Sequence, residues 1–251
     1  MPKLAKCHVY PESISAELGG EARALVTMSL EGGGRSSYAR AGMYDREIVC
    51  PSCEELFKDA DDCAIDFRRR VLGWVPPYRF LPYPDATIKL PIFPGDSRLL
   101  HQFAVQSWLR AHLSNRFIEK ENKNSDLERI IAKAILDKSE TIDLGIQVAY
   151  VFDVSPFGRL MMNPISHTAV FPMYELAMGR MTVLIASTDK GLPPGFRDIA
   201  LNGTNEALVY RTRRFNDMRL DIFAEFYSSN REKVDRMFQA ALYKGKRKAA
   251  V

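Results

Sequence analysis

The segment between Trp74 and Gly95 limits what this chain can fold into, because it holds six of the fourteen prolines. Each proline fixes φ near about −65° and removes a backbone donor, so this stretch can form neither a regular helix nor a central strand. Aromatic and aliphatic residues lie between the prolines, and they predict a segment that runs along the body of the protein. We therefore expect residues 76–96 to connect an N-terminal part, 1–75, to a larger part, 97–251.

Composition is typical of a globular chain. The 251 residues are 46% apolar and 26% charged, and a chain of this length can fold without a metal or a disulfide. The chain begins without the apolar core of a signal peptide, and its longest apolar stretch is much shorter than the roughly 20 residues that span a bilayer. We expect a cytoplasmic location and no membrane partner.

The net charge of +4 is unevenly distributed. Residues 1–75 hold ten Lys and Arg against twelve Asp and Glu, whereas residues 76–251 hold 25 against 19. Arg211, Arg213 and Arg214 end an expected strand, and alternation places Arg211 and Arg213 on one face. These arginines are candidates for binding the phosphates of a nucleic acid, and solvated charge without a ligand is the other interpretation.

Hydrophobic periodicity and capping residues predict an α+β fold, because helices are followed by a run of strands and then by helices. In the N-terminal part we expect strands at 7–10, 24–30 and 46–50, a helical turn at 11–18 and a helix from Pro51. In the larger part we expect helices at 97–113, capped by Ser97, and at 127–137, with a capping box of Ser125 and Glu128. Further strands are expected at 144–154, 159–162, 169–171, 181–187 and 206–211, before two terminal helices.

Four cysteines are present, and a cytoplasmic chain is not expected to join them in disulfides. Cys50 and Cys53 are separated by two residues, a spacing that lets both thiolates bind one ion and predicts half of a structural zinc site. Redox chemistry and ordinary buried thiols are the alternatives. The remaining ligands would come from Cys7, His8, Cys63 or water. Because adjacent strand residues point to opposite faces, Cys7 and His8 are not both expected to bind the ion.

The distance to Cys63 depends on the helix that begins at Pro51. If this helix were continuous, the ten residues from Cys53 to Cys63 would span about 15 Å, too far for a shared ion. A break at residues 59–62 would keep Cys63 available.

Two segments together resemble a known family. Their sequences are Cys7-His8-Val-Tyr-Pro11 and Gly42-Met-Tyr-Asp45-Arg-Glu-Ile-Val-Cys50-Pro-Ser-Cys53-Glu54. They look like the prokaryotic HNH-type treble-clef proteins, whose first strand reads His-(Ile/Val)-x-Pro and whose later helix opens with Cys-x-x-Cys. The likeness covers about residues 5–66.

This resemblance implies a small zinc-bound ββα-metal module that cleaves phosphodiester bonds of nucleic acid with Mg²⁺, joined by the proline-rich segment to a larger α+β body. Such a pairing is typical of bacterial defence or toxin-type effectors. Carried over residue by residue, the resemblance implies His8 as general base, Glu54 as a carboxylate near the Mg²⁺, and Cys50 and Cys53 as zinc ligands. We expect Asp45, another carboxylate close in sequence, to join the Mg²⁺ site, and Cys7 to substitute in part for the family's upstream cysteines as a zinc ligand.

The alternative is a non-catalytic, zinc-stabilised interaction protein that binds a protein or nucleic-acid partner. No asparagine precedes Asn115, so the asparagine that orients the histidine in many HNH enzymes is absent between His8 and Cys50. The upstream Cys-x-x-Cys of the family is also absent. Six acidic residues between positions 54 and 66 favour a basic partner over phosphates.

Two other pairs of residues are candidates for a site. His101 and His112 are eleven residues apart and share one helical face, where we expect them to be packed beside Trp108 rather than to bind a ligand. Asn163 and His167 lie before an expected strand, as cleft residues do, but no paired acid or nucleophile accompanies them.

Overall fold

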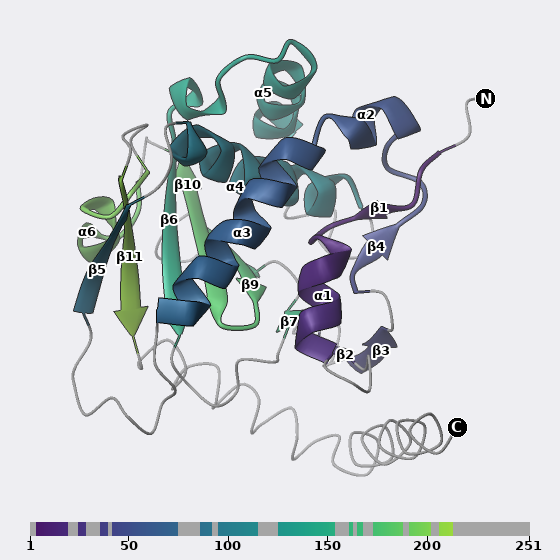
Figure 1. The fold of residues 1–251 in the computed structure, drawn as a ribbon. Coiled ribbons are helices and arrows are strands. Elements are labelled where there is room, and N and C mark those ends of the chain that lie inside the picture. The colour runs from purple at the N-terminus through teal and green to yellow at the C-terminus, as the bar shows by residue number, and fades with distance from the viewer. Residues whose placement is uncertain are drawn as a thin grey trace, which may run out of the picture.

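A computed structural model describes residues 4–19, 25–28, 36–39, 42–74, 86–91, 95–114, 125–153, 161–162, 165–167, 173–187, 191–201 and 206–212. Within these residues the protein is α+β, as the sequence predicts. It has a nine-stranded mixed sheet, a separate two-stranded sheet and helices that lie against them (Figure 1). No helix in this described part is long and apolar enough to cross a membrane.

The bounds of the elements are as follows. The helices are α1 Glu12–Gly19, α2 Pro51–Glu55, α3 Lys58–Trp74, α4 Asp96–Leu113, α5 Ser125–Leu136 and α6 Pro194–Arg197, with a 3₁₀ turn at Thr141–Leu144. The strands are β1 Cys7–His8, β2 Leu25–Met28, β3 Ser36–Ala39, β4 Tyr44–Asp45, β5 Ala86–Pro91, β6 Ile146–Asp153, β7 Met161–Met162, β8 Ile165–His167, β9 Met173–Met178, β10 Met181–Ser187 and β11 Glu206–Thr212.

The large sheet has the strand order β3-β2-β7-β9-β10-β6-β11-β5, and β8 pairs with β9. Two pairs are parallel, β2 with β7 and β11 with β6, and the others are antiparallel. A tight turn joins β9 to β10, where Met178 faces Met181 and Gly179 has φ of 66°. Glycine suits this turn because other residues rarely adopt positive φ.

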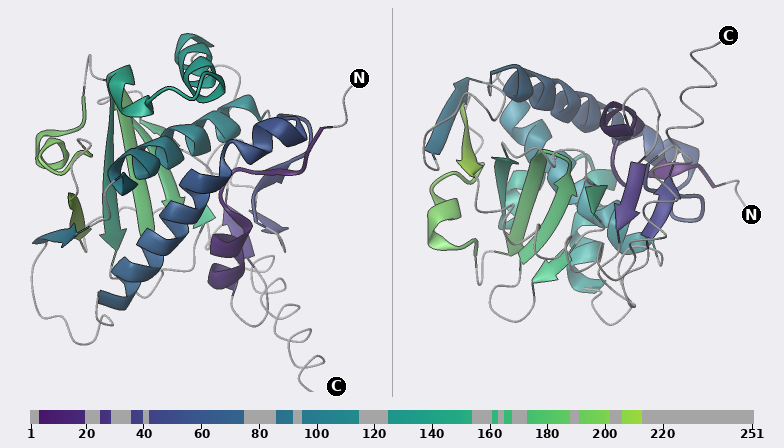
Figure 2. Two further views of the ribbon diagram at one scale, coloured as in Figure 1. Left: turned by 45° about the horizontal axis from the view of Figure 1, so that its top comes forward. Right: turned by 90° about the horizontal axis from the view of Figure 1, so that it is seen from below.

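Alternation along the central strands divides their apolar side chains between two cores. Val148, Tyr150 and Phe152 of β6 belong to the main core, whereas Ala149 and Val151 belong to a smaller core on the other face. Helices α3 and α4 lie across the first face, and the segment that contains α6 covers the second (Figures 1 and 2). Burial on both faces explains the nearly continuous apolar sequence of β6.

A buried ion pair joins α3 to α4. The guanidinium of Arg110 is fully buried and donates two hydrogen bonds to the carboxylate of Asp61, at 2.8 and 2.9 Å. Gln106 donates both to Asp61 and to the carbonyl of Phe57, whose ring lies 5.0 Å from the guanidinium. Burial alone would lower the pKa of Arg110, but Asp61 outweighs it and the pKa is raised. Arg110 therefore remains charged inside the protein.

Several predicted elements are confirmed. The predicted helical turn is α1, the helix from Pro51 is α2 with α3, and the helices at 97–113 and 127–137 are α4 and α5. The strands predicted at 144–154, 159–162, 181–187 and 206–211 are β6, β7, β10 and β11, and β2 lies within 24–30. Strands β3, β5, β8 and β9 were not predicted. The predicted strand at 169–171 and the terminal helices lie outside the described residues.

Two local predictions were wrong, and the structure also decides a point that the sequence left open, the continuity of the helix from Pro51. The second strand of the N-terminal part is Tyr44–Asp45 and not 46–50, because the Asp45 side chain accepts a hydrogen bond from the amide of Glu47 and turns the chain. Helix α4 begins at Asp96 with Gly95 as its N-cap, so Ser97 is not the cap. The helix from Pro51 is interrupted at residues 56–57, before the acidic run, and α3 continues through Cys63.

The proline-rich segment contributes β5, which pairs only with β11 among the described strands and so occupies an edge. The sequence excluded a central strand here but did not predict this edge strand, where prolines are tolerated. Strands from both sides of this segment share the large sheet, and side chains from Cys7 to Leu201 share the main core. The division into parts 1–75, 76–96 and 97–251 is a statement about which parts can fold independently. It stays a prediction.

Removing Asp61 leaves the Arg110 charge buried without its partner. We expect Asp61→Ala to lower the free energy of unfolding by about 3–5 kcal/mol, measured by urea denaturation. Asp126→Ala is the control, because Asp126 is 88% exposed and its pair with Arg129 contributes less than about 1 kcal/mol. A loss from Asp61→Ala that is no larger than the control's would contradict the importance of the pair.

Candidate functional site

The two-stranded sheet of β1 and β4 has one buried face and one face toward solvent. β1 and β4 are antiparallel, with Cys7 opposite Asp45 and His8 opposite Tyr44. Cys7 and Asp45 are buried, whereas His8 and Tyr44 are only partly buried. Exposed residues Lys6 and Arg46 continue the alternation on the solvent side. We call Lys6, His8, Tyr44 and Arg46 the outer face.

His8 has three identifiable neighbours. Its Nε2 lies 3.4 Å from Oε2 of Glu12, one turn away at the start of α1, and its ring centroid lies 5.7 Å from that of Tyr44. Nδ1 is buried and has no hydrogen-bond partner among the described residues. Burial and, after it, the charge of Lys6 lower the pKa of His8 to about 4, against the opposing effect of Glu12. The imidazole is therefore neutral at pH 7.

Two cations flank the tyrosine of the outer face. The Lys6 ammonium lies 4.5 Å from the centroid of the Tyr44 ring, and the Arg46 guanidinium lies 5.8 Å from it. Both distances are within the range of cation–π contacts. The outer face thus combines two positive charges, an aromatic ring and a neutral imidazole, which is a suitable combination for a phosphate-bearing ligand.

The predicted zinc half-site lies at the start of α2. Cys50 is the N-cap of this helix, and its sulfur lies 2.9 Å from that of Cys53 and 3.1 Å from Oγ of Ser52. Hydrogen bonds from Cys53 and then Ser52 lower the pKa of Cys50 to about 7. The same contact, with burial, raises the pKa of Cys53. The two thiols are therefore unequal, and Cys50 is the more reactive.

The cysteine pair fits zinc in part. Two sulfurs bound to one tetrahedral zinc ion lie about 3.8 Å apart, so zinc requires the two side chains to separate slightly. Thiols are suitable zinc ligands, but no group of three His, Cys, Asp or Glu side chains in the described part is placed to hold one metal ion. The structure thus supplies two donors and does not add Cys7 to them.

The other predicted site residues point into the protein. Burial raises the pKa of the Cys7 thiol strongly, and the adjacent carboxylate of Glu54 adds to this effect. One carboxylate oxygen of Glu54 is buried without a hydrogen-bond partner among the described residues. Asp45 accepts a 2.6 Å hydrogen bond from the hydroxyl of Ser114. The structure therefore brings Cys7 close to Glu54. In the described part of the chain, no hydrogen bond or ion pair joins Asp45 or Glu54 to His8.

Cys63 lies elsewhere, in α3. Its thiol contacts the carbonyl oxygen of Asp96 at 3.9 Å, and burial raises its pKa to about 12. Cys63 therefore has a packing role. Among the described residues, no hydrogen bond joins its thiol to Cys50 or Cys53.

The histidines of α4 are packed, as the sequence predicts. His101 is buried and hydrogen-bonds the hydroxyl of Thr141 and the carbonyl of Ile146, and burial lowers its pKa. His112 stacks on Trp108 at 4.3 Å and lies 3.4 Å from Glu128. These contacts hold α4 against its neighbours and leave no shared histidine site.

Other predicted residues fall at or beyond the limits of the described chain. Arg211 lies in β11, and its backbone alone is described. His167 ends β8 and is likewise described only in its backbone. Arg213, Arg214 and Asn163 lie outside the described residues, so their roles stay predictions.

Sequence reasoning found His8 but missed the four residues that are placed with it, Glu12, Lys6, Tyr44 and Arg46. Glu12 follows His8 by four positions, a spacing that places side chains together where a helix begins. Lys6, Tyr44 and Arg46 could have been found by extending the strand alternation that was applied to Cys7 and His8. The incorrect bounds of the second strand hid this pattern.

Comparison with protein-family models, with curated proteins and with solved structures finds no match to this chain.

The unequal thiols predict selective alkylation. We expect iodoacetamide at pH 7.5 to modify Cys50 first, because its pKa is near 7 while the pKa values of Cys7, Cys53 and Cys63 are raised. Peptide mass spectrometry after short exposure measures the order of modification. Ser52→Ala should slow the reaction because it removes one hydrogen bond to the Cys50 thiolate. Faster labelling of Cys7 or Cys63 would contradict this arrangement.

The environment of His8 predicts its titration by NMR. We expect a midpoint near pH 4, raised in Lys6→Gln and lowered in Glu12→Gln. Unfolded chains protonate histidine near pH 6.5, so the stability that neutral His8 contributes is present above that pH and is lost as the pH falls toward 4. His101 is the internal control, because Lys6 is not among the groups that shift its pKa. A His8 midpoint near 6.5 would refute the proposed environment.

Proposed function

We propose that the outer face binds the phosphate backbone of a nucleic acid and that His8 acts there as general base in phosphodiester cleavage. The observation that carries this proposal is the neutral imidazole of His8 on the same face as Lys6, Arg46 and Tyr44. β1, β4 and α2 follow one another in the order of the ββα unit that the sequence resembles, with α1, β2 and β3 inserted between the two strands.

Binding would follow from charge and stacking. Lys6 and Arg46 are exposed and can contact phosphate oxygens, while Tyr44 offers a surface on which a base can stack. These contacts do not depend on base sequence, so we expect little sequence preference.

Catalysis would depend on proton transfer. A neutral histidine can accept the proton of an attacking water, whereas a protonated one cannot. Glu12 is positioned to orient the His8 ring and to stabilise the positive charge that the ring gains. Its low pKa makes His8 a weak base in the free protein, and a bound phosphate would raise that pKa toward neutrality.

The proposal includes a structural zinc ion bound at the cysteine pair. Cys50 and Cys53 would supply two of its ligands and fix the start of α2 relative to the strands. Asp45 and Glu54, which the sequence predicts for a Mg²⁺ site, face the interior and do not form such a site in the described arrangement.

That inward orientation favours a second candidate function. A zinc-stabilised module whose carboxylates are not beside its histidine would bind a partner without cutting it. In this case the outer face would bind nucleic acid, and His8 would contribute only to packing.

One set of assays distinguishes the two functions. We expect the purified chain to bind single-stranded oligonucleotides and to cleave plasmid, single-stranded DNA or transfer RNA when Mg²⁺ is added. His8→Ala should reduce cleavage at least about 100-fold, because general-base catalysis contributes that much, and should leave oligonucleotide affinity nearly unchanged. Lys6→Gln combined with Arg46→Gln should weaken binding about tenfold at low salt, measured by fluorescence polarisation.

Arg129→Gln is the matched control, because Arg129 is 80% exposed and lies on α5. Binding without turnover on every substrate would support the non-catalytic function. Absence of oligonucleotide binding, or a loss of affinity in Arg129→Gln equal to that of the Lys6 and Arg46 variant, would refute both functions. Zinc content measured by elemental analysis tests the cysteine pair separately, and Cys50→Ser combined with Cys53→Ser should remove the metal.

A further inference from the structure

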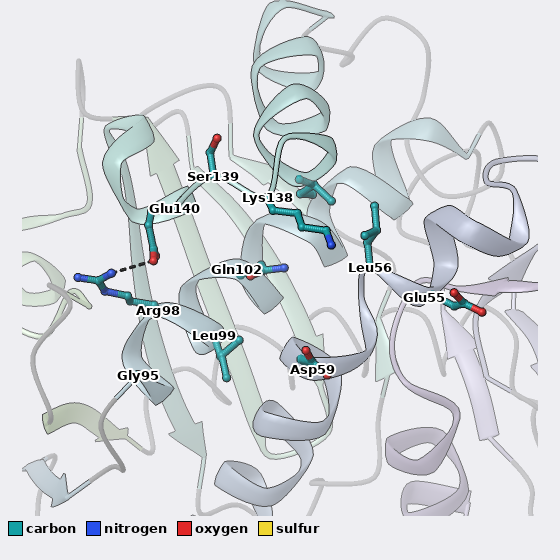
Figure 3. Close-up of a pocket in the computed structure, with 11 residues that line it drawn as sticks. Glu55, Leu56, Asp59, Gly95, Arg98, Leu99, Gln102, Lys138, Ser139 and Glu140 are labelled. Carbon is teal, nitrogen blue, oxygen red and sulfur yellow. Dashed lines mark hydrogen bonds and ion pairs between the residues drawn. The ribbon is translucent and has the colours of Figure 1, made fainter.

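A cleft of about 750 Å³ lies apart from the outer face (Figure 3). Its walls come from the end of α2, the beginning of α3, the first turns of α4 and the turn that follows α5. The volume is in the range of clefts that hold small molecules.

Charged and polar side chains face this cleft from different helices. The carboxylate of Asp59, the amide of Gln102 and the ammonium of Lys138 lie around one hollow in Figure 3. None of these three side chains forms a hydrogen bond or an ion pair with another residue in the described part of the chain. By contrast, Arg98 and Glu140 pair with each other at 2.7 Å and close one end. The cleft therefore presents one negative and one positive group that are not paired with each other.

The backbone holds Lys138 in an uncommon conformation. Lys138 has φ of 53°, and it follows α5 as the left-handed residue of a Schellman turn. The amide of Ser139 donates a hydrogen bond to the carbonyl of Ala134 at 2.8 Å. The amide of Lys138 donates one to the carbonyl of Ile135 at 3.2 Å. Glycine is the usual residue here because it avoids the strain of positive φ. A glycine would supply no ammonium to the cleft.

Aliphatic side chains complete the lining. Leu56, Leu99 and Ile135 come from three different segments and give the cleft an apolar part. A ligand that fits would thus carry a cation, an anion and an aliphatic portion.

We propose that this cleft binds a small zwitterion of the amino-acid or short-peptide type. Its ammonium would contact Asp59, its carboxylate would contact Lys138, and a peptide amide would hydrogen-bond Gln102. Its aliphatic side chain would lie on the apolar part of the lining. A nucleotide fits less well, because the lining holds three carboxylates and two cations, and one of those cations is already paired.

Calorimetry on the full chain tests the chemistry of the ligand. The probes are L-leucine, alanyl-leucine, N-acetyl-alanyl-leucine, alanyl-leucine amide and adenosine monophosphate. We expect leucine or alanyl-leucine to bind at least about tenfold more tightly than either blocked peptide, because each blocked peptide loses one charged hydrogen bond. Absence of binding, equal binding of the blocked peptides, or tightest binding of adenosine monophosphate would overturn the proposal.

Two substitutions test the residues. Asp59→Asn should weaken binding of alanyl-leucine about tenfold. Lys138→Gly should also weaken binding of alanyl-leucine about tenfold. Its melting temperature should be unchanged or about 2 °C higher, because glycine accepts the positive φ. A purely structural role for Lys138 predicts no loss of affinity. Lys133→Gln is the control. Lys133 is exposed on α5, the helix that Lys138 follows, and it does not line the cleft. Equal loss in this control would also overturn the proposal.

Discussion

Arg110 and Asp61 form a buried ion pair on which the arrangement of the helices depends. The pair joins α3 to α4 across 49 residues of sequence, and Gln106 links the same carboxylate to the carbonyl of Phe57. Phe57 lies in the short break between α2 and α3. The pair therefore determines where α2 ends, where α3 begins and how both lie against α4. Two sites depend on this arrangement, because α2 carries the cysteine pair and α3 with α4 forms much of the cleft.

The two faces of the small sheet separate residues that are adjacent in sequence. Cys7 and His8 are neighbours, yet the thiol is buried near Glu54 and the imidazole lies beside Tyr44 on the outer face. Burial raises the pKa of the thiol and lowers the pKa of the imidazole, because it disfavours the charged form of each. Both groups are therefore neutral at pH 7. A neutral thiol is a weak nucleophile and a poor metal ligand, whereas a neutral imidazole can accept a proton.

The surface of the protein thus carries two chemically different regions. The outer face is cationic and aromatic, and it suits an extended polyanion. The cleft between α3, α4 and α5 has mixed charge and an apolar part, and it suits a compact zwitterion. Cys50 caps helix α2, Cys53 lies inside it and Glu55 ends it, so the cysteine pair and one rim of the cleft belong to the same six residues, 50–55. A metal bound by that pair would stabilise a wall of the cleft as well as the small sheet.

The sequence by itself determined the α+β class, most helices, strands β6 and β10 and the close pairing of Cys50 with Cys53. These features follow from local periodicity and from a spacing of three residues, which short-range geometry decides. It also predicted opposite faces for Cys7 and His8, since strand alternation is local. Only the tertiary structure decided that Asp45 bonds to Ser114, that Asp61 pairs with Arg110 and that Asp59 and Lys138 share a cleft. Those contacts join residues 49 to 79 positions apart, and they depend on how whole helices pack, which no local pattern specifies.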